Sequence, residues 1–168
     1  RQRQMCIRDR LLSVVHKKNQ KKESIDFSNL IIALDSVNDP GNLGTIIRIA
    51  DWFNIKSILC SKNTVDLYNS KVIQSSMGSF SRVDVFYDNL EDVLDSKDIS
   101  VFGTSTDGVD INKFEKPDKG IILFGSESKG VSEHLKKYVD KWISIKKNGG
   151  AESLNVSVSV GIILHKMA

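Results

Sequence analysis

Cysteine is scarce in this sequence: only Cys6 and Cys60 occur among 168 residues. Two cysteines make no disulfide framework. A single pairing between them stays open, but two free thiols in a reducing cytoplasm are the simpler interpretation. A chain of this length buries a full hydrophobic core without such cross-links. We therefore expect a cytoplasmic protein with one domain of ordinary size.

Long apolar runs are also missing. No segment approaches the roughly 20 apolar residues that span a bilayer, and no charged-then-apolar signal segment opens the chain. Histidine and cysteine never cluster at the spacing of metal ligands. We therefore expect neither a membrane partner nor a metal.

The familiar phosphate-binding loops are absent as well. GSESKG, at 125–130, lacks the GK[ST] ending of a P-loop, and no GxGxxG motif follows the first apolar run. These absences argue against nucleotide hydrolysis and ordinary dinucleotide binding. A flavodoxin-like or other nucleotide-binding α/β protein stays an alternative.

The formal net charge of +3 lies entirely in the first ten residues, RQRQMCIRDR, which hold four arginines against one aspartate. This segment has no hydrophobic periodicity and resembles a non-native leader, so residues 1–10 are set aside from the fold argument. The rest of the chain is formally neutral and by itself indicates no nucleic-acid partner. Local basic clusters remain, at Lys17, Lys18, Lys21 and Lys22, at Lys136 and Lys137, and at Lys146 and Lys147.

Short apolar runs separated by amphipathic segments predict the fold class. The runs are continuous rather than alternating, which is typical of strands covered on both faces of a mostly parallel sheet. Residues 43–53 have helical spacing, with Asn42 as the expected N-cap, and further helices are expected from Asp66, Asp88 and Ser132. The pattern predicts a three-layer α/β domain. The six runs begin at Leu30, Lys56, Arg82, Ile99, Gly120 and Trp142.

Two terminal segments behave differently from this alternation. Residues 11–29 hold a short apolar run, LLSVV, and a charged connector, and are expected to be the remnant or linker of an upstream domain. Near the C-terminus, residues 154–162 alternate as a strand does, yet the same apolar residues also fall at helical spacing. Periodicity leaves strand and helix both open for that segment.

Three ordered segments carry a resemblance to a known family. DPGNLGTIIRIADWFNI at 39–55, FGSESKGVSE at 124–133 and ISIKKNGGAESLNVSVSVGIIL at 143–164 resemble the motifs of the SpoU branch of the SPOUT RNA methyltransferases. The resemblance implies a SpoU-type methyltransferase domain at 30–168 with a C-terminal deep trefoil knot, a departure from the usual unthreaded connections. It also implies that 153–164 is a helix, that the chain forms a homodimer, and that the upstream domain bound RNA.

The implied activity is transfer of a methyl group from S-adenosylmethionine to a ribose 2′-hydroxyl of rRNA or tRNA. A non-catalytic knotted module that binds RNA or assists assembly is the alternative. The implied cofactor-binding residues are Thr104, Ser105, Gly108, Phe124, Gly125, Ser126, Ile145, Gly150 and Leu154. The implied catalytic residues are Arg48, Asn42, Glu127, Ser153 and Asn155.

The implied catalytic residues also have ordinary structural interpretations. Arg48 matches the proposed proton acceptor, but deprotonating an arginine near neutral pH costs roughly 8 kcal/mol, so it could instead bind a phosphate or stabilise an alkoxide. Without the motif it would be a solvated charge near Asp51. Asn42, Ser153 and Asn155 could be helix caps, and Glu127 a turn carboxylate.

Overall fold

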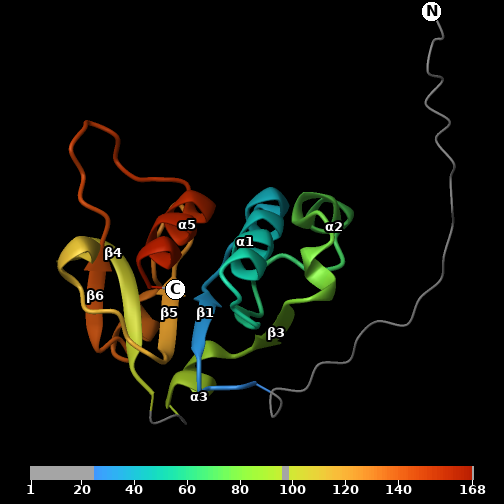
Figure 1. Cartoon of the computed structure of the whole chain (residues 1–168), viewed down its shortest axis with the longest axis horizontal. Coiled ribbons are helices and arrows are strands. Elements are labelled where there is room, and N and C mark those ends of the chain that lie inside the picture. Colours follow the sequence, from blue (N-terminus) through green and yellow to red (C-terminus); the bar gives the residue numbers. More distant parts are fainter. Residues whose placement is uncertain (1–24, 96–98, 168) are drawn as a thin grey trace, which may run out of the picture.

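The computed structural model describes residues 25–95 and 99–167, which form a parallel six-stranded sheet covered by helices (Figure 1). The sheet order is β3-β2-β1-β5-β4-β6, and every neighbouring pair is parallel. Each of the six apolar runs overlaps one strand, so the predicted parallel α/β sheet is confirmed. The strands are β1 (Leu30–Leu34), β2 (Ser57–Ser61), β3 (Asp84–Asp88), β4 (Val101–Asp110), β5 (Gly120–Phe124) and β6 (Lys141–Ser144).

Five α-helices in the described residues accompany the sheet. The helices expected from Asp66, Asp88 and Ser132 begin a few residues later or at the next residue. The C-terminal segment is a helix, as the resemblance implied, although half of its pattern favoured a strand. The helices are α1 (Pro40–Trp52), α2 (Ser70–Ser76), α3 (Leu90–Asp95), α4 (Glu133–Lys136) and α5 (Val156–Met167), with short 3₁₀ turns at Ser79–Ser81 and Ile111–Lys113.

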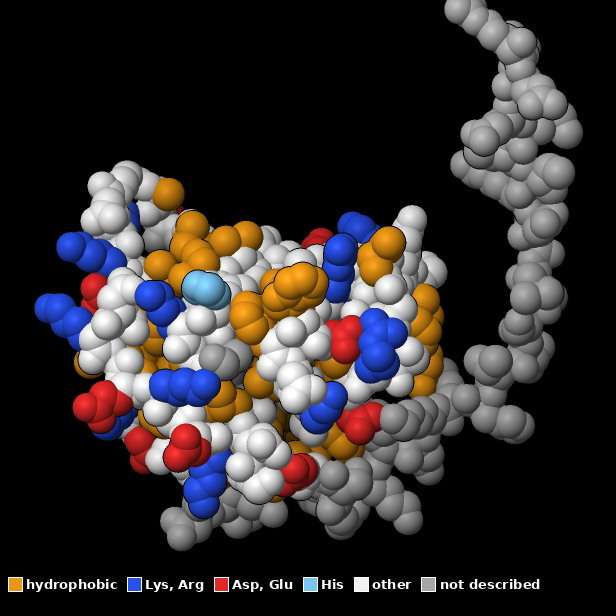
Figure 2. Space-filling model, viewed as in Figure 1, with side chains coloured by type: hydrophobic (Ala, Val, Ile, Leu, Met, Phe, Trp, Pro, Cys, Tyr) orange, Lys and Arg blue, Asp and Glu red, His pale blue; other side chains and the backbone are white. Residues whose placement is uncertain are grey.

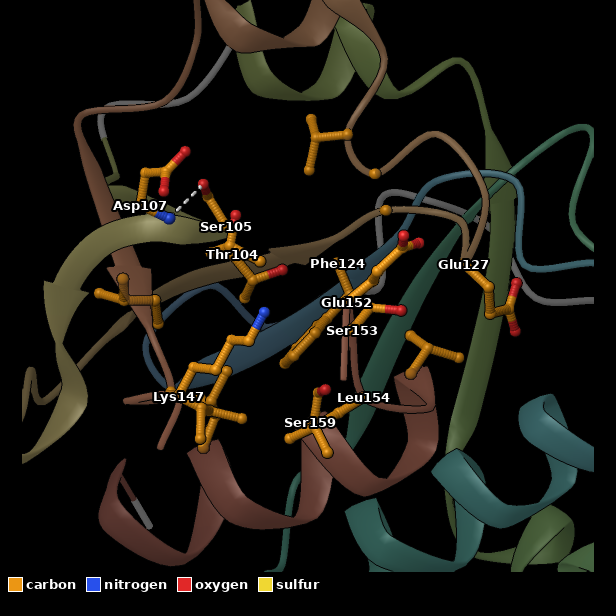
Figure 3. A pocket seen from close by; sticks show the side chains of 18 of the residues that line it. Thr104, Ser105, Asp107, Phe124, Glu127, Lys147, Glu152, Ser153, Leu154 and Ser159 are labelled. Carbon is orange, nitrogen blue, oxygen red and sulfur yellow. Dashed lines mark hydrogen bonds between the residues drawn. The ribbon is translucent and has the colours of Figure 1, made fainter. Parts of the chain in front are cut away.

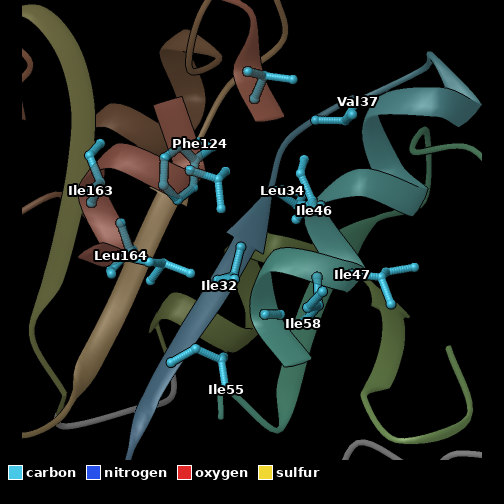
Figure 4. Close-up of a cluster of buried hydrophobic side chains, with 14 of the residues drawn as sticks. Ile32, Leu34, Val37, Ile46, Ile47, Ile55, Ile58, Phe124, Ile163 and Leu164 are labelled. Atoms are coloured by element: carbon cyan, nitrogen blue, oxygen red, sulfur yellow. The ribbon is translucent and has the colours of Figure 1, made fainter. Parts of the chain in front are cut away.

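Strand β1 shows why the domain has three layers. Leu30, Ile32 and Leu34 point to one face, where they pack with α1, α2 and α5. Ile31 and Ala33 point to the other face, where they pack with α3 and α4. Figure 4 shows the first of these clusters, with side chains of α1 and α5 meeting the strands. A buried aliphatic side chain contributes about 1.5–3 kcal/mol, so both faces stabilise the sheet.

The strand order places a switch point between β1 and β5. From β1 the chain builds outward through β2 to β3, while β5, β4 and β6 lie on the other side. Helix α5 then returns beside α1, where a Cβ on Gly161 would lie 3.6 Å from the Ile49 side chain (Figure 1). Open α/β sheets bind ligands beyond the carboxyl ends of their strands at such points.

Several features singled out in the sequence lie outside the described residues: the short apolar run at 11–15, the lysine cluster at 17–22, and Cys6. Within the described residues, no helix has the length and apolar character needed to cross a bilayer. Cys60 is a free thiol, fully buried on β2, and burial raises its pKa.

Candidate active site

A pocket of about 820 Å³ lies beyond the carboxyl ends of β4, β5 and β6. Figure 3 shows its side chains converging from the three strand-end segments and from the first turns of α5. The pocket therefore lies where the sheet topology predicts a ligand site. The wall includes nine of the residues implied as functional: Thr104, Ser105, Phe124, Gly125, Ser126, Glu127, Ile145, Ser153 and Leu154.

The first wall is a bulge inside β4 rather than a turn after it. Thr104 and Val109 both face Ile143 of β6, so residues 105–108 are extra in this strand. The bulge is held by Thr104 Oγ1, which donates to Leu123 O at 3.1 Å, and by Ser105 Oγ, which accepts from the Asp107 N–H at 3.1 Å (Figure 3). A bulge re-aims side chains, which here brings the 104–107 segment onto the pocket wall.

Gly108, implied as a cofactor contact, is not on that wall. A Cβ at this position would lie 2.6 Å from backbone atoms of Ile143. Its carbonyl accepts from Ser144 Oγ at 2.8 Å. Gly108 thus lets β4 pack closely on β6, behind the pocket.

The second wall is the loop after β5, at 125–131. Ser126 and Gly130 exchange backbone hydrogen bonds of 3.1 and 2.9 Å, and Gly130 has a φ of +65°. A Cβ on Gly125 would lie 1.9 Å from the Gly130 carbonyl carbon. The loop therefore folds back directly onto Gly125, which only a residue without a side chain permits.

The third wall is the long segment between β6 and α5, which arches away from the sheet before it reaches the helix (Figure 1). Ile145, Ser153 and Leu154 line the pocket from this segment. Gly150 does not, and a Cβ there would have nothing within 4 Å. The structure thus gives no steric reason for a glycine at this position.

Asn42 is not the N-cap of α1, so that prediction is wrong. Asp39 caps the helix, its Oδ1 accepting from the Asn42 N–H at 2.9 Å, and Pro40 occupies the first helical position, where no amide donor is needed. Asn42 lies within the first turn. Its side chain is therefore available for contacts outside the helix.

Asn42 joins the three sequence motifs through hydrogen bonds. Its Nδ2 donates to Glu127 Oε1, and its Oδ1 accepts from Asn155 Nδ2 at 2.9 Å. Asn155 Oδ1 in turn accepts from the Ser157 N–H at 2.9 Å, as an N-cap of α5 does. Because that cap fixes the Asn155 amide, its NH₂ group must face Asn42, whose own NH₂ must then face Glu127. We call this sequence of contacts the amide chain.

Asn155 therefore has the expected capping role and a second contact besides. Ser153 does not cap α5, so its capping interpretation is wrong; it lies on the pocket wall. Glu127 is more than a turn carboxylate, since it closes the amide chain across 85 positions of sequence.

Arg48 lies on the exposed side of α1 and is not on the pocket wall. It follows Asn42 by six positions, which places it about 9 Å further along the helix and roughly 120° around it. It does not pair with Asp51, whose carboxylate binds Arg82 at 2.6 Å and Ser79 at 2.7 Å. The Arg82 hydrogen bonds lower the pKa of Asp51. Within the described residues Arg48 makes no hydrogen bond or ion pair, so its catalytic assignment stays a prediction.

Several wall residues were not predicted from the sequence. Asp107 and Glu152 lie inside the predicted loops, and Lys146 and Lys147 form a predicted basic cluster beside the site. The α5 contribution follows helical spacing, a signal that becomes usable only once the segment is known to be a helix. The unpredicted residues include Asp107, Lys129, Trp142, Glu152, Val156, Ser159 and Ile163.

No group of three or more histidine, cysteine, aspartate or glutamate residues in the described ranges is arranged to hold a metal ion. The pocket instead combines hydroxyls, backbone edges, an apolar floor, three carboxylates and four lysines, the last at Lys129, Lys136, Lys146 and Lys147. Apolar side chains at Phe124, Ile143 and Ile163 suit a planar ring. The charges of both signs suit a ligand with cationic groups beside an anionic partner.

Comparison with known proteins gives consistent relatives. The chain is 30% identical over 150 residues to the Bacillus subtilis 23S rRNA (guanosine(2553)-2′-O)-methyltransferase RlmP, covering 87% of this chain and 60% of that protein. Its structure is similar to that of an AdoMet-bound rRNA methyltransferase from Sinorhizobium meliloti, with a TM-score of 0.78 and 31% identity over 84% of this chain and 56% of that one.

A second structural relative is the SpoU methyltransferase AviRb from Streptomyces viridochromogenes, solved with AdoMet. Its TM-score is 0.77, with 26% identity over 84% of this chain and 57% of that one. The chain thus spans about 60% of the length of these relatives. Residues 29–165 match the SpoU rRNA Methylase family. This matched range includes all three motifs and every strand and helix described above, except the last two residues of α5. The chain belongs to the SpoU rRNA Methylase family.

Proposed function

We propose that this chain carries the catalytic domain of a cytoplasmic RNA methyltransferase. It would use S-adenosylmethionine to methylate a ribose 2′-hydroxyl of rRNA or tRNA. The observation that carries the proposal is the pocket, whose walls are built by the strand-end loops of a chain that matches the SpoU family over residues 29–165. The B. subtilis relative, an rRNA 2′-O-methyltransferase by name, supports the reaction class.

The pocket residues fit the cofactor. Its adenine would lie against the apolar floor, and backbone edges of the three loops would hydrogen-bond its polar edges. The carboxylates of Asp107, Glu127 and Glu152 would favour the positive charges of its sulfonium and ammonium groups. When bound, S-adenosylmethionine supplies a methyl group on a cationic sulfur, which makes that carbon open to in-line attack by oxygen.

The protein's task is then to position the ribose and remove its proton. A C–O bond would form as the C–S bond breaks, the electron pair of the broken bond would stay on the sulfur of the leaving thioether, and the hydroxyl proton would pass to solvent water. Most of the rate gain comes from holding the two reactants at attack distance. Glu127, held by the amide chain, and Ser153, on the wall, are the polar groups that would orient the ribose. Arg48 would stabilise the developing alkoxide or a neighbouring phosphate.

RNA would approach over Lys146 and Lys147. Both line the pocket, and neither makes a hydrogen bond or a salt bridge within the described residues, although the charge of Lys146 helps to lower the pKa of Asp110. The other described lysine cluster is partly neutralised, because Lys136 binds Glu133 at 2.5 Å and Lys137 lies 4.0 Å from Glu91. Unpaired lysines beside the pocket contribute more to binding an RNA backbone than paired ones.

We also propose that the chain forms a homodimer through α5 and α1. Val158 and Ile162 lie one turn apart on the outer side of α5 and are 49% and 37% exposed, and Leu154, just before the helix, is 47% exposed. Trp52 at the end of α1 is 84% exposed. Figure 2 shows hydrophobic side chains gathered over these two helices. Large exposed apolar surface of this kind is typical of an interface.

The dimer has a direct test. Sedimentation equilibrium of the wild-type protein should give twice the mass of one chain. Val158→Asp should give the monomer, because a carboxylate would be buried at the interface. Met77→Asp is the matched control: Met77 is 70% exposed at the far end of α2 and should leave the dimer intact. A monomeric wild-type protein would refute the proposal.

The knot is a further part of the proposal. Threading of 153–167 through the chain is supported by the position of α5 against α1 and by the pocket wall that 125–131 and 145–154 share. An experimental chain trace with an unthreaded C-terminus would contradict it.

Calorimetry and methyl transfer test the activity. The protein should bind S-adenosylmethionine and transfer tritiated methyl groups to rRNA or tRNA, and nuclease digestion should recover them as 2′-O-methyl nucleosides. Arg48→Ala should lose methyl transfer while keeping cofactor affinity within about threefold. Arg48→Lys should keep part of the transfer activity if the positive charge is what matters. Binding of RNA with no cofactor affinity would instead support the non-catalytic module.

A further inference from the structure

Asp35 is a buried carboxylate that the proposed chemistry does not use. Asp35 follows β1 directly, and only 3% of its surface is exposed to solvent. Within the described residues it forms no ion pair. Burying a carboxylate without a countercharge is costly unless its oxygens accept hydrogen bonds. Its hydrogen-bond partners therefore indicate what it does.

The backbone and side chain of Asp35 hold the two ends of one loop. Its N–H donates to the Phe124 carbonyl at 2.8 Å, where the chain enters the 125–131 loop. Its Oδ2 accepts from the Ser132 N–H at 2.8 Å, where the chain leaves that loop. Its other oxygen, Oδ1, accepts from Ser36 Oγ at 3.0 Å. The contact with Ser132 spans 97 positions of sequence.

The loop between these anchors forms one wall of the pocket and carries Glu127. Its middle, at 127–130, is exposed, and inside the loop the Ser126–Gly130 backbone pair and the Lys129 N–H to Ser126 Oγ contact at 3.3 Å hold its shape. These internal contacts do not fix the loop to the sheet. The exit of the loop is fixed there by the buried side chain of Val131 and by the Asp35 carboxylate.

We propose that Asp35 is a positioning residue: by accepting the Ser132 N–H it holds the 125–131 loop at the distance from β1 that forms the cofactor wall and presents Glu127 to Asn42. The expected effect of Asp35 on cofactor binding rests on the proposed function. Its expected effect on the mobility of the loop does not, because that mobility is measured on the protein alone.

Two variants remove the same hydrogen bond from opposite sides. Asp35→Ala removes the acceptor. Ser132→Pro removes the donor and leaves the carboxylate in place, and the Ser132 φ of −59° suits proline. Two controls keep the bond. Asp35→Asn can accept from Ser132 with its oxygen and donate to Ser36 Oγ with its NH₂ group, whereas Ser36→Ala removes only the other contact.

Calorimetric titration with S-adenosylmethionine and hydrogen–deuterium exchange of the 125–131 amides decide the matter. Asp35→Ala and Ser132→Pro should weaken cofactor binding about ten- to hundredfold, as expected for loss of a hydrogen bond to a charged group, and should speed exchange in this loop. Both controls should stay within about threefold and keep wild-type exchange. A general loss of structure would instead speed exchange throughout the sheet.

Three outcomes would overturn the proposal: unchanged loop exchange in Ser132→Pro, equal damage from Asp35→Asn and Asp35→Ala, or faster exchange spread over the whole sheet. If the wild-type protein binds no S-adenosylmethionine, the proposed function fails, while the exchange experiment still decides the role of Asp35.

Discussion

The amide chain has a fixed direction, and reversing it gives a sharp test. Asn155→Asp keeps the cap of α5, since aspartate caps as well as asparagine, but it cannot donate to Asn42. The Asn42 amide must then either face a carboxylate with its oxygen or flip and turn that oxygen toward Glu127. One of the two contacts becomes repulsive in either case.

The magnitude follows from one lost and one repulsive contact near the surface. A neutral hydrogen bond contributes about 0.5–1.5 kcal/mol, and the added charge at the α5 N-terminus returns about 0.5 kcal/mol. We expect Asn155→Asp to lower the free energy of unfolding by about 1 kcal/mol. Glu127→Gln alone should cost a similar amount or less, because the glutamine oxygen can still accept from Asn42.

The double variant should lose less unfolding free energy than the two single variants lose together. With Asn155→Asp and Glu127→Gln together, a flipped Asn42 donates to the new carboxylate and accepts from the new amide, so that the whole chain runs in reverse. Urea denaturation of all four proteins gives the coupling free energy, which we expect to be favourable by about 1 kcal/mol. Additive losses within about 0.3 kcal/mol would refute the directed amide chain.

Two further predictions concern the loop glycines and one ion pair. Gly125→Ala should abolish cofactor binding and destabilise the fold by about 2 kcal/mol, whereas Gly150→Ala should change neither, as calorimetry and urea denaturation will show. Arg82→Gln should destabilise the protein near pH 7 and have no effect near pH 2. Arg82 holds the pKa of Asp51 low in the folded state. Their contact therefore stabilises the folded protein at pH values above the pKa that Asp51 has in the unfolded chain. That stabilisation is lost as the pH falls through the lower pKa that Asp51 has in the folded protein. A destabilisation independent of pH would contradict this.

Sequence patterning predicted the sheet because burial on both faces leaves a plain signal. Runs such as LIIAL and GIILF are fully buried in β1 and β5, and hydrophobic composition alone identifies them. The C-terminal helix was not predictable in the same way. Residues 154–162 alternate because Val156 and Val160 face the core while Val158 and Ile162 face outward, so that one segment fits both periods.

The site was predictable in outline and not in its contacts. The resemblance implied cofactor-binding residues in three segments, and seven of the nine line the pocket. The misassigned N-cap of α1 shows the limit: in DPGN both Asp39 and Asn42 are good caps, and only the backbone geometry selects Asp39. The Asp35 anchor left no signal, because a single aspartate after a strand is ordinary in sequence.

The contacts of Asn155 show why capping and function need not be alternatives here. Its carbonyl oxygen is used by α5, and this use is what aims its NH₂ group at Asn42. A residue that only capped the helix could be serine, which offers a single hydroxyl and no opposed donor. An asparagine is needed where one amide must accept on one side and donate on the other. The structural requirement of α5 thus sets the direction of the hydrogen bonds that reach Glu127, so that the start of the last helix and the polar edge of the pocket are fixed by the same side chain.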